Sequence, residues 1–409
     1  MTIEVPIAGQ PVGRVPALSR GTSQMGVRLY NERLALSLIR KHGSLSKAEI
    51  ARLTGLSAQT VSVIVRHLES DGLLNRGMPR RGRVGQPQVP FTLNPDGAYA
   101  IGLKVGRRSG DLMLLDLTGV VRNTRHRPYA FPSPKALLTF VKSEIEALLS
   151  ELKPKQRARI SGLGIAAPFE LWSWEEEVGA PHEVLAAWRN FDLPGEIGKL
   201  CDWPVHFCND ATAACAAELL FGKSHAHHDH AYFYVGYFAG GGIVVNGSLY
   251  QGRSGNAGAL GSFPVPAPGG KAQQLIRTAS FYVLERELQR AGGDPDLLWR
   301  NGEDWSGAGE ALDRWIVSAA ESLAQAAAGV ASVLECEAIV IDGAMPAAVR
   351  ARLVALTAKA LKRVNLQGIS PFTLVEGTIG ATARAMGAAS LPLFANFIID
   401  RDVLFKEQG

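Results

Sequence analysis

Residues 45–68 read LSKAEIARLTGLSAQTVSVIVRHL and contain two helix starts separated by one glycine. Ser46 and Glu49 have the spacing of a capping box, in which each side chain bonds the backbone amide of the other residue. Gly55 permits a sharp turn, and Ser57 is placed to cap the next helix. The stretch therefore predicts a helix-turn-helix, an arrangement that DNA-binding proteins use.

Further elements are expected on both sides of this stretch. Apolar side chains recur at helical spacing over residues 31–42, and Gly43 supplies a stop. Strands are expected at 73–74 and 89–93, and the arginine-rich loop between them completes a wing. The predicted divisions of the chain are a flexible tail at 1–25, a winged helix-turn-helix at 26–95 and an α/β unit at 96–409.

The candidate DNA contacts lie on the polar face of the second helix of this motif and in the wing. A recognition helix enters the major groove, where Gln pairs with adenine and Ser or Thr contacts bases or phosphates. Arginines of a wing suit a narrow minor groove. The alternative is a protein-interaction module with a basic loop. The predicted DNA-binding residues are Ser57, Gln59, Thr60, Ser62, Arg66, Arg80, Arg81 and Arg83.

The charge of the chain is concentrated where the motif lies. Residues 1–92 hold 13 Lys and Arg against 5 Asp and Glu, a net charge of +8, whereas the remainder carries −3. Cationic residues that neutralise phosphates release condensed counterions, which favours binding to a polyanion. Double-stranded DNA is therefore the expected macromolecular partner.

Composition excludes several other classes of protein. The chain has 409 residues, 46% hydrophobic and 20% charged, as expected for a globular protein of two or three domains. Its four cysteines form no CxxC pair, so neither a zinc ribbon nor a disulfide framework is expected, and a reducing cytoplasm suits them. The Ala-rich stretch Ala324–Leu334 is too short to span a bilayer, so no membrane partner is expected.

Beyond residue 96, short β-rich runs alternate with helical segments, which indicates α/β architecture. The Asn246-Gly247 pair predicts a hairpin with a type I′ turn, and Gly240–Gly242 is interpreted as a tight backbone turn. A hairpin is expected to end at Val121. The main predicted strands are Tyr99–Val105, Leu112–Leu117, Ser161–Pro168, Val205–Phe207, Ala231–Gly236 and Ile243–Val245.

Several motifs occur in a fixed order along the chain. They are Asn209–Ala214 followed by Glu218, Gly240–Gly242 with Asn246-Gly247, Gly252–Gly258, Ala338–Gly343 and Gly377–Ala389. This order, over about residues 26–395, resembles the ROK family, which contains sugar kinases of actin-like fold and repressors that attach a winged helix to that fold. The resemblance implies that residues 96–409 form a two-lobed actin-like (ribonuclease H-like) ATPase-type domain that binds an effector and oligomerises.

The resemblance also implies a ligand cleft and its residues. A sugar or sugar derivative is expected beside Asn209, Asp210, Gly255 and Asn256. Asn209 and Asp210 are able to hydrogen-bond hydroxyl groups. The alternative is that the Asp210 carboxylate caps the helix Ala211–Leu220, a common structural role at a helix N-terminus. The implied oligomer is a homodimer or homotetramer, and repression rather than activation rests on the resemblance alone.

The chain departs from the kinases of the family at the residues that serve catalysis. Lys104–Arg108 replaces their Asp-x-Gly-Gly-Thr turn, and Gly236-Tyr237-Phe238 replaces a Gly-Thr-Gly phosphate loop. Ala259 and Ser262 stand where a sugar-binding Glu and a His that serves sugar and zinc are usual, and no Cys cluster follows. No phosphoryl transfer, cofactor or metal is therefore expected, although Asp210 matches the general base of the kinases.

Three functions remain open at this point. The first is a transcriptional regulator that responds to a sugar, the second a sugar kinase that retains a DNA-binding domain, and the third a DNA-binding protein that needs no ligand. Lys104, Tyr237 and Phe238 count against the second function, whereas Ala259 and Ser262 keep the third open. The His-rich segment His225–His230 is interpreted as a solvated loop rather than a metal site.

Overall fold

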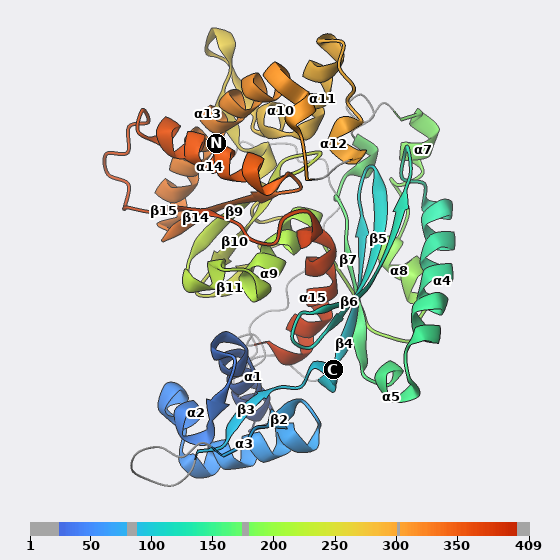
Figure 1. Ribbon diagram of the computed structural model, residues 1–409, viewed down its shortest axis with the longest axis vertical. Coiled ribbons are helices and arrows are strands. Elements are labelled where there is room, and N and C mark those ends of the chain that lie inside the picture. The colour runs from blue at the N-terminus through green and yellow to red at the C-terminus, as the bar shows by residue number, and fades with distance from the viewer. Residues whose placement is uncertain (1–23, 80–87, 174–179, 301–302, 399–409) are drawn as a thin grey trace, which may run out of the picture.

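The computed structural model describes residues 24–79, 88–173, 180–300 and 303–398 (Figure 1). A small winged unit lies at one end of the molecule, and two larger lobes, each built on a five-stranded sheet, make up the rest. The winged unit contains α1 Gln24–His42, β1 Leu45–Ser46, α2 Lys47–Thr54, α3 Ala58–Ser70, β2 Leu74–Arg76 and β3 Pro90–Leu93, with its strands in the order β1-β3-β2.

The predicted helix-turn-helix is confirmed in its local geometry. The backbone amide of Glu49 donates to the Ser46 hydroxyl over 3.3 Å, and the Ser46 amide donates to the Glu49 carboxylate over 2.7 Å. Gly55 ends α2 with a φ of 72°, which is the left-handed conformation that glycine adopts without strain. Two correctly capped helices therefore meet at the predicted turn.

The predicted start of the first helix is wrong. The helix begins at Gln24 rather than Asn31, because its first turns rest on polar contacts and a buried glycine that apolar periodicity does not reveal. Arg28 pairs with Glu32 one turn later over 2.9 Å, and Gly26 is buried. Two residues of the expected 1–25 tail are thus helical, and residues 1–23 lie outside the described residues.

The first lobe is a mixed sheet in the order β6-β5-β4-β7-β8. The central strand β4 pairs antiparallel with β5 and parallel with β7. Strands β4, β5 and β6 therefore form an antiparallel meander, and β4, β7 and β8 run parallel to one another. Its strands are β4 Tyr99–Val105, β5 Ser109–Asp116, β6 Val121–Pro128, β7 Ile160–Ala166 and β8 Val205–Cys208. Its outer helices are α4 Pro134–Glu151, α5 Pro154–Arg157, α7 His182–Ala186 and α8 Leu193–Gly198.

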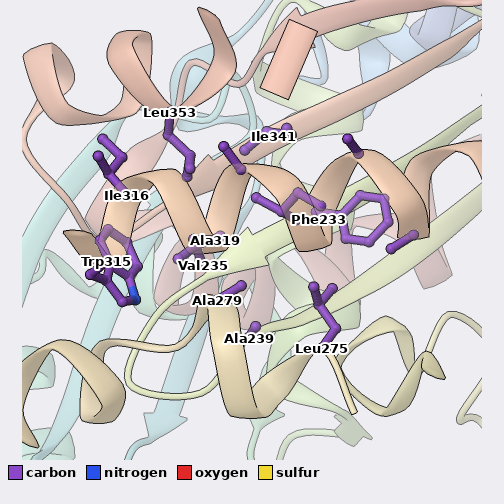
Figure 2. Packing of buried hydrophobic residues seen from close by; sticks show 14 of the residues in the cluster. Phe233, Val235, Ala239, Leu275, Ala279, Trp315, Ile316, Ala319, Ile341 and Leu353 are labelled. Atoms are coloured by element: carbon purple, nitrogen blue, oxygen red, sulfur yellow. The ribbon is translucent and has the colours of Figure 1, made fainter. Parts of the chain in front are cut away.

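The second lobe repeats a mixed sheet in the order β11-β10-β9-β14-β15. Figure 2 shows its core, in which Phe233 and Ile341 of the sheet pack against Trp315 and Ala319 of the long helix α13. The strands of this lobe are β9 His230–Val235, β10 Gly240–Val245, β11 Ser248–Tyr250, β12 Pro264–Pro266, β13 Ala272–Gln274, β14 Ala338–Gly343 and β15 Thr373–Glu376. Its helices include α10 Ile276–Ala279, α11 Phe281–Arg290, α12 Leu297–Arg300, α13 Gly309–Leu334 and α14 Ala347–Leu361.

Helix α13 is longer than the Ala-rich stretch suggested. The apolar segment Ser306–Leu334 has 29 residues, enough by length and composition to cross a membrane, so the shortness of Ala324–Leu334 does not extend to the whole helix. Its most apolar window is 56% buried inside the lobe, where Trp315, Ile316 and Leu323 join the core. The helix therefore packs as a core helix.

Most predicted strands are confirmed, and two interpretations are corrected. The expected hairpin end at Val121 is wrong, because Val121 begins β6, whose mostly exposed, arginine-rich sequence hides the strand. The expected tight turn at Gly240–Gly242 is also wrong, because these residues lie in β10. A Cβ atom on Gly242 would lie 2.5 Å from the Cys215 Cβ atom, so the glycines let a helix approach the strand. The type I′ turn is confirmed by positive φ angles at Asn246 and Gly247.

The two lobes meet through helices α9 Asp210–Phe221 and α15 Ala383–Phe397. Helix α9 packs on β10 of the second lobe, and α15 packs on β4 and β7 of the first lobe. A Cβ atom on Gly387 would lie 1.8 Å from the carbonyl oxygen of Ala213, so the two helices touch backbone to backbone. Small residues therefore bring the lobes into direct contact.

The winged unit shares a hydrophobic cluster with the first lobe. Ile39 and Phe91 of the winged unit pack in one cluster with Ala100 and Leu117 of that lobe and with Leu393 of α15. Arg159 adds hydrogen bonds from the first lobe to the carbonyl oxygens of Asp71 and Gly97. The winged unit is thus docked on the lobe and on the end of α15.

We predict that Gly387→Ala destabilises the fold by about 1–3 kcal/mol, because the added methyl group has to displace the α9 backbone. Urea unfolding followed by circular dichroism measures the change. Gly198→Ala is the matched control, since a Cβ atom there meets nothing within 4 Å and the substitution suits a helix. Equal stability of the two variants would show that α9 and α15 are not close-packed.

Candidate DNA interface and ligand cleft

The structure places four predicted DNA-binding residues on α3 and a fifth, Ser57, directly before it. Gln59, Thr60 and Arg66 are exposed, and Ser62 is half-buried. Ser57 is the N-cap residue of α3, and its hydroxyl accepts the backbone amide of Thr60 over 3.1 Å. Because that hydroxyl already caps the helix, Ser57 orients α3 as well as facing outward. The wing residues Arg80, Arg81 and Arg83 lie outside the described residues.

Sequence reasoning missed two residues of this surface. The Lys47 ammonium, at the start of α2, donates to the Ser62 hydroxyl over 3.2 Å and lies 5.8 Å from the centre of the Phe91 ring. Val63 is 57% exposed between the polar side chains of α3. Val63 follows Thr60 by three residues, so the two lie on the same face of a helix, and this spacing could have identified Val63 from the sequence. An exposed valine suits the methyl group of thymine, and Lys47 suits a phosphate.

A cavity of about 160 Å³ lies between the two lobes. It is smaller than the roughly 300–1,000 Å³ typical of pockets for drug-sized ligands, so it suits a small molecule. Three of the four predicted ligand residues line it, namely Asn209, Asp210 and Asn256. Gly255 is not a lining residue; a Cβ atom there would lie 3.7 Å from the Phe169 ring at the cavity wall.

The residues at the start of α9 have distinct roles. Asn209 is the cap, because its side-chain oxygen accepts the amide of Ala211 over 3.0 Å. The alternative that Asp210 caps the helix is therefore wrong. Asp210 is the first helical residue, and its carboxylate accepts a hydrogen bond from the guanidinium of Arg384 over 3.1 Å. Both side chains of this ion pair are nearly buried, so the pair is a fixed part of the cleft.

Sequence reasoning missed Arg384. It lies at the start of α15, and its guanidinium also lies 5.1 Å from the centre of the Tyr234 ring. A signal was present, because Arg384 is the only charged residue in Gly377–Ala389. Its partner Asp210 is 174 residues away in sequence, so only the folded chain reveals the pair.

Lys104 forms a second ion pair near the cleft. Its ammonium donates to the Asp111 carboxylate over 2.6 Å and to the Ser109 hydroxyl over 2.7 Å. Burial lowers the pKa of Lys104 to about 8, and the positive charge of Arg384 acts in the same direction. The turn that follows β4 therefore begins beside a buried ammonium group, that of Lys104, which is already paired with Asp111.

The segment between β9 and β10 contains Tyr237 and Phe238, whose rings pack against other aromatic side chains. Phe238 meets Tyr282 edge to face with ring centres 5.2 Å apart, and Tyr237 lies 5.9 Å from Trp299. The guanidinium of Arg107 sits 3.8 Å from the centre of the Phe238 ring, close enough for a cation–π interaction. Arg107 and Phe238 both line the cavity, and sequence reasoning did not assign Arg107 to it.

Within the residues that the structure describes, no cluster of three or more His, Cys, Asp or Glu side chains could hold a metal ion. Ala259 and Ser262 line the cavity. In the His-rich segment, His230 is buried in β9, and burial lowers its pKa to about 4.

Comparison with known proteins identifies both parts of the chain. A winged helix-turn-helix DNA-binding family matches residues 28–75, and the ROK family matches residues 100–279. The first match covers the helix-turn-helix described above. The second match extends from β4 to α10, including the cleft residues on α9.

Relatives with known sequences align with most of the chain. The xylose repressor of Bacillus subtilis is 26% identical over 66% of this chain and 69% of its own length. The DNA-binding transcriptional dual regulator NagC of Escherichia coli is 25% identical over 68% of both chains. An uncharacterised protein of Sinorhizobium fredii is 26% identical over 90% of this chain and 91% of its own.

Solved structures share the fold. A ROK family transcriptional regulator, homologous to the Escherichia coli MLC protein, has a TM-score of 0.64 and 21% identity over 91% of this chain and 98% of its own. A ROK family glucokinase of Streptomyces griseus, in complex with glucose and AMPPNP, has a TM-score of 0.56 and 21% identity over 72% of this chain and 99% of its own. The chain therefore combines a ROK family domain, matched over residues 100–279, with an N-terminal winged helix-turn-helix, matched over residues 28–75, and it shares the fold of these solved structures.

Proposed function

We propose that this protein is a transcriptional repressor that binds an operator through α3 and the wing and responds to a sugar or sugar derivative in the cleft. The observation that carries the proposal is the presence, in one chain, of an exposed recognition helix and of a cavity lined by Asn209, Asp210 and Asn256. Relatives named xylose repressor and N-acetylglucosamine repressor support both halves. The protein acts in the cytoplasm, where DNA is accessible.

We assign the divisions of the chain accordingly. Residues 26–95 bind DNA, and residues 96–409 bind the effector and form the homodimer or homotetramer. A two-fold oligomer presents two recognition helices, which matches operators built from two half-sites. A ligand can regulate such a protein only if its affinity differs between two conformations of the chain.

The cleft chemistry favours binding over catalysis. Phosphoryl transfer needs groups that position the nucleotide and stabilise its phosphates. Here Lys104 is buried and paired with Asp111, and Phe238 with Arg107 occupies the cavity wall beside β10. Asp210, the residue that matches a kinase base, is already paired with Arg384. We infer that the protein is not an enzyme.

We predict that the purified protein does not phosphorylate sugars. A coupled ATPase assay with glucose, xylose and N-acetylglucosamine, each with Mg²⁺-ATP, measures the rate. A rate of about 1 per second or more would lie in the ordinary range of enzymes and would establish the kinase alternative.

We predict that Arg66→Ala and the triple variant Arg80/Arg81/Arg83→Ala weaken binding to DNA from the region upstream of the gene. Loss of three phosphate contacts lowers the slope of log affinity against log salt by up to about 2.7. Fluorescence anisotropy at several salt concentrations measures both quantities. Arg189→Ala is the control, because Arg189 is exposed and lies outside the winged unit. An unchanged affinity and slope for the triple variant would contradict the role of the wing.

We predict that Asp210→Asn weakens binding of the sugar at least tenfold, because a charge-assisted hydrogen bond contributes roughly 1.5–3 kcal/mol. Calorimetry with xylose, glucose and N-acetylglucosamine identifies the ligand on the wild type and then measures the variant. Asp192→Ala is the control, since Asp192 caps α8 through the Gly195 amide and does not line the cavity. A variant that melts at a lower temperature but binds the sugar equally well would place the ligand elsewhere.

A further inference from the structure

Helix α9 has one end in the cleft and the other end at the winged unit. Asp210 begins the helix and lines the cavity, and Phe221 ends it, about 17 Å away at 1.5 Å per residue. Phe221 packs beside the hydrophobic cluster that the winged unit shares with the first lobe. One helix therefore connects the candidate ligand site, through Asp210, with the cluster beside the winged unit, through Phe221.

Hydrogen bonds fix α9 to the second lobe. The buried Glu218 carboxylate accepts the amides of Lys223 and Ser224 and, beyond β15, those of Thr378 and Ile379. Close packing against β10 adds to this attachment, as the 2.5 Å approach at Gly242 shows. Most of helix α9 is therefore attached to the second lobe, and its last residue, Phe221, reaches Gly119 of the first lobe.

Most of helix α15, in contrast, packs on the first lobe and on α1, whereas its first residues, Ala383 and Arg384, contact Tyr234 of the second lobe. Cβ atoms on Gly102 and Gly164 would lie 2.3 Å and 1.8 Å from α15 backbone atoms, so the helix lies directly on β4 and β7. Near its other end, the carbonyl oxygen of Ala395 accepts a hydrogen bond from Arg33 of α1 over 2.7 Å. The first lobe, α15 and α1 thus form one packed body.

Arg40 of α1 contacts both bodies. Its guanidinium donates to the carbonyl oxygen of Leu117 in the first lobe over 2.8 Å. The same guanidinium lies 5.6 Å from the centre of the Phe221 ring, at the end of α9. The ring also packs against Gly119, where a Cβ atom would lie 2.3 Å from it, so a shift of Phe221 has to displace its neighbours.

We infer that α9 transmits occupancy of the cleft to the winged unit through Phe221 and Arg40. A ligand that hydrogen-bonds Asp210 competes with Arg384 for the carboxylate and loosens the link between the starts of α9 and α15. Helix α9 then shifts against α15 about the contact between Ala213 and Gly387, and Phe221 moves against α1. Arg384 and Phe221 are positioning residues in this mechanism, which rests on the proposed function.

A double-mutant cycle tests the coupling without a known ligand. Arg384→Met removes the link in the cleft, and Phe221→Leu removes the contact with Arg40. Anisotropy with the upstream DNA measures the dissociation constant of the wild type, both single variants and the double variant. We expect Arg384→Met alone to change the dissociation constant fivefold or more, within the range of allosteric couplings. When Phe221→Leu is also present, we expect Arg384→Met to change the dissociation constant less than twofold. An equal effect in both backgrounds, or no effect of Arg384→Met in either, overturns the inference.

Arg350→Met is the matched control for loss of a buried arginine. The side chains of Arg350 and Arg384 are each 12% exposed, and Arg350 pairs with Asp342 and Glu376 within the second lobe. We expect no coupling between Arg350→Met and Phe221→Leu. If Arg384→Met does not fold, Asp210→Asn replaces it, because the amide keeps the shape of the carboxylate and removes its charge.

Hydrogen exchange separates failure of the inference from failure of the proposed function. Arg384→Met should alter amide exchange in α1, over Gln24–His42, only in the chain that retains Phe221. This measurement needs no DNA, so it tests the coupling even if the wild type does not bind its upstream DNA, a result that would overturn the proposed function alone. Unaltered exchange in α1 would overturn the inference, whatever the DNA affinity.

Discussion

The architecture depends on the backbone contact between α9 and α15. Gly387 meets Ala213 so closely that no larger residue fits, and Gly102 and Gly164 hold α15 equally tightly on the first sheet. These contacts bury little apolar surface per residue, but they fix the distance between the lobes and thereby the width of the cleft. They also bring Arg384 to Asp210, because the two residues begin the two helices that the contact joins.

The sequence predicted those elements whose signals are local. The capping box at Ser46 is encoded within four residues, and β4 lies in a short β-rich run, so its predicted bounds are confirmed. The motif Ala338–Gly343, found through the family resemblance, forms strand β14. Elements whose formation depends on tertiary packing were not predicted correctly. The first turns of α1 lack an apolar stripe, and Gly240–Gly242 has the composition of a turn although it pairs with β9 as a strand.

The candidate site was predicted in the same uneven way. Asn209, Asp210 and Asn256 belong to motifs with a fixed local order, and the structure brings them to one cavity. Arg384 and Arg107 were missed because each acts on a partner far along the chain, Asp210 and Phe238 respectively. A pattern within one segment cannot reveal a contact whose two sides are separated by more than one hundred residues.

The charges of the cleft give a physical reason why this fold serves regulation in the proposed function. A general base has to be available to its substrate, whereas Asp210 is held by Arg384 and has to exchange this partner when a ligand arrives. Replacing Arg384 with a ligand at the Asp210 carboxylate hinders catalysis, because breaking the ion pair uses part of the binding energy of the ligand. It serves a switch, because the ligand and the ion pair then favour different arrangements of α9 and α15, and a difference in free energy between two arrangements is what allostery requires.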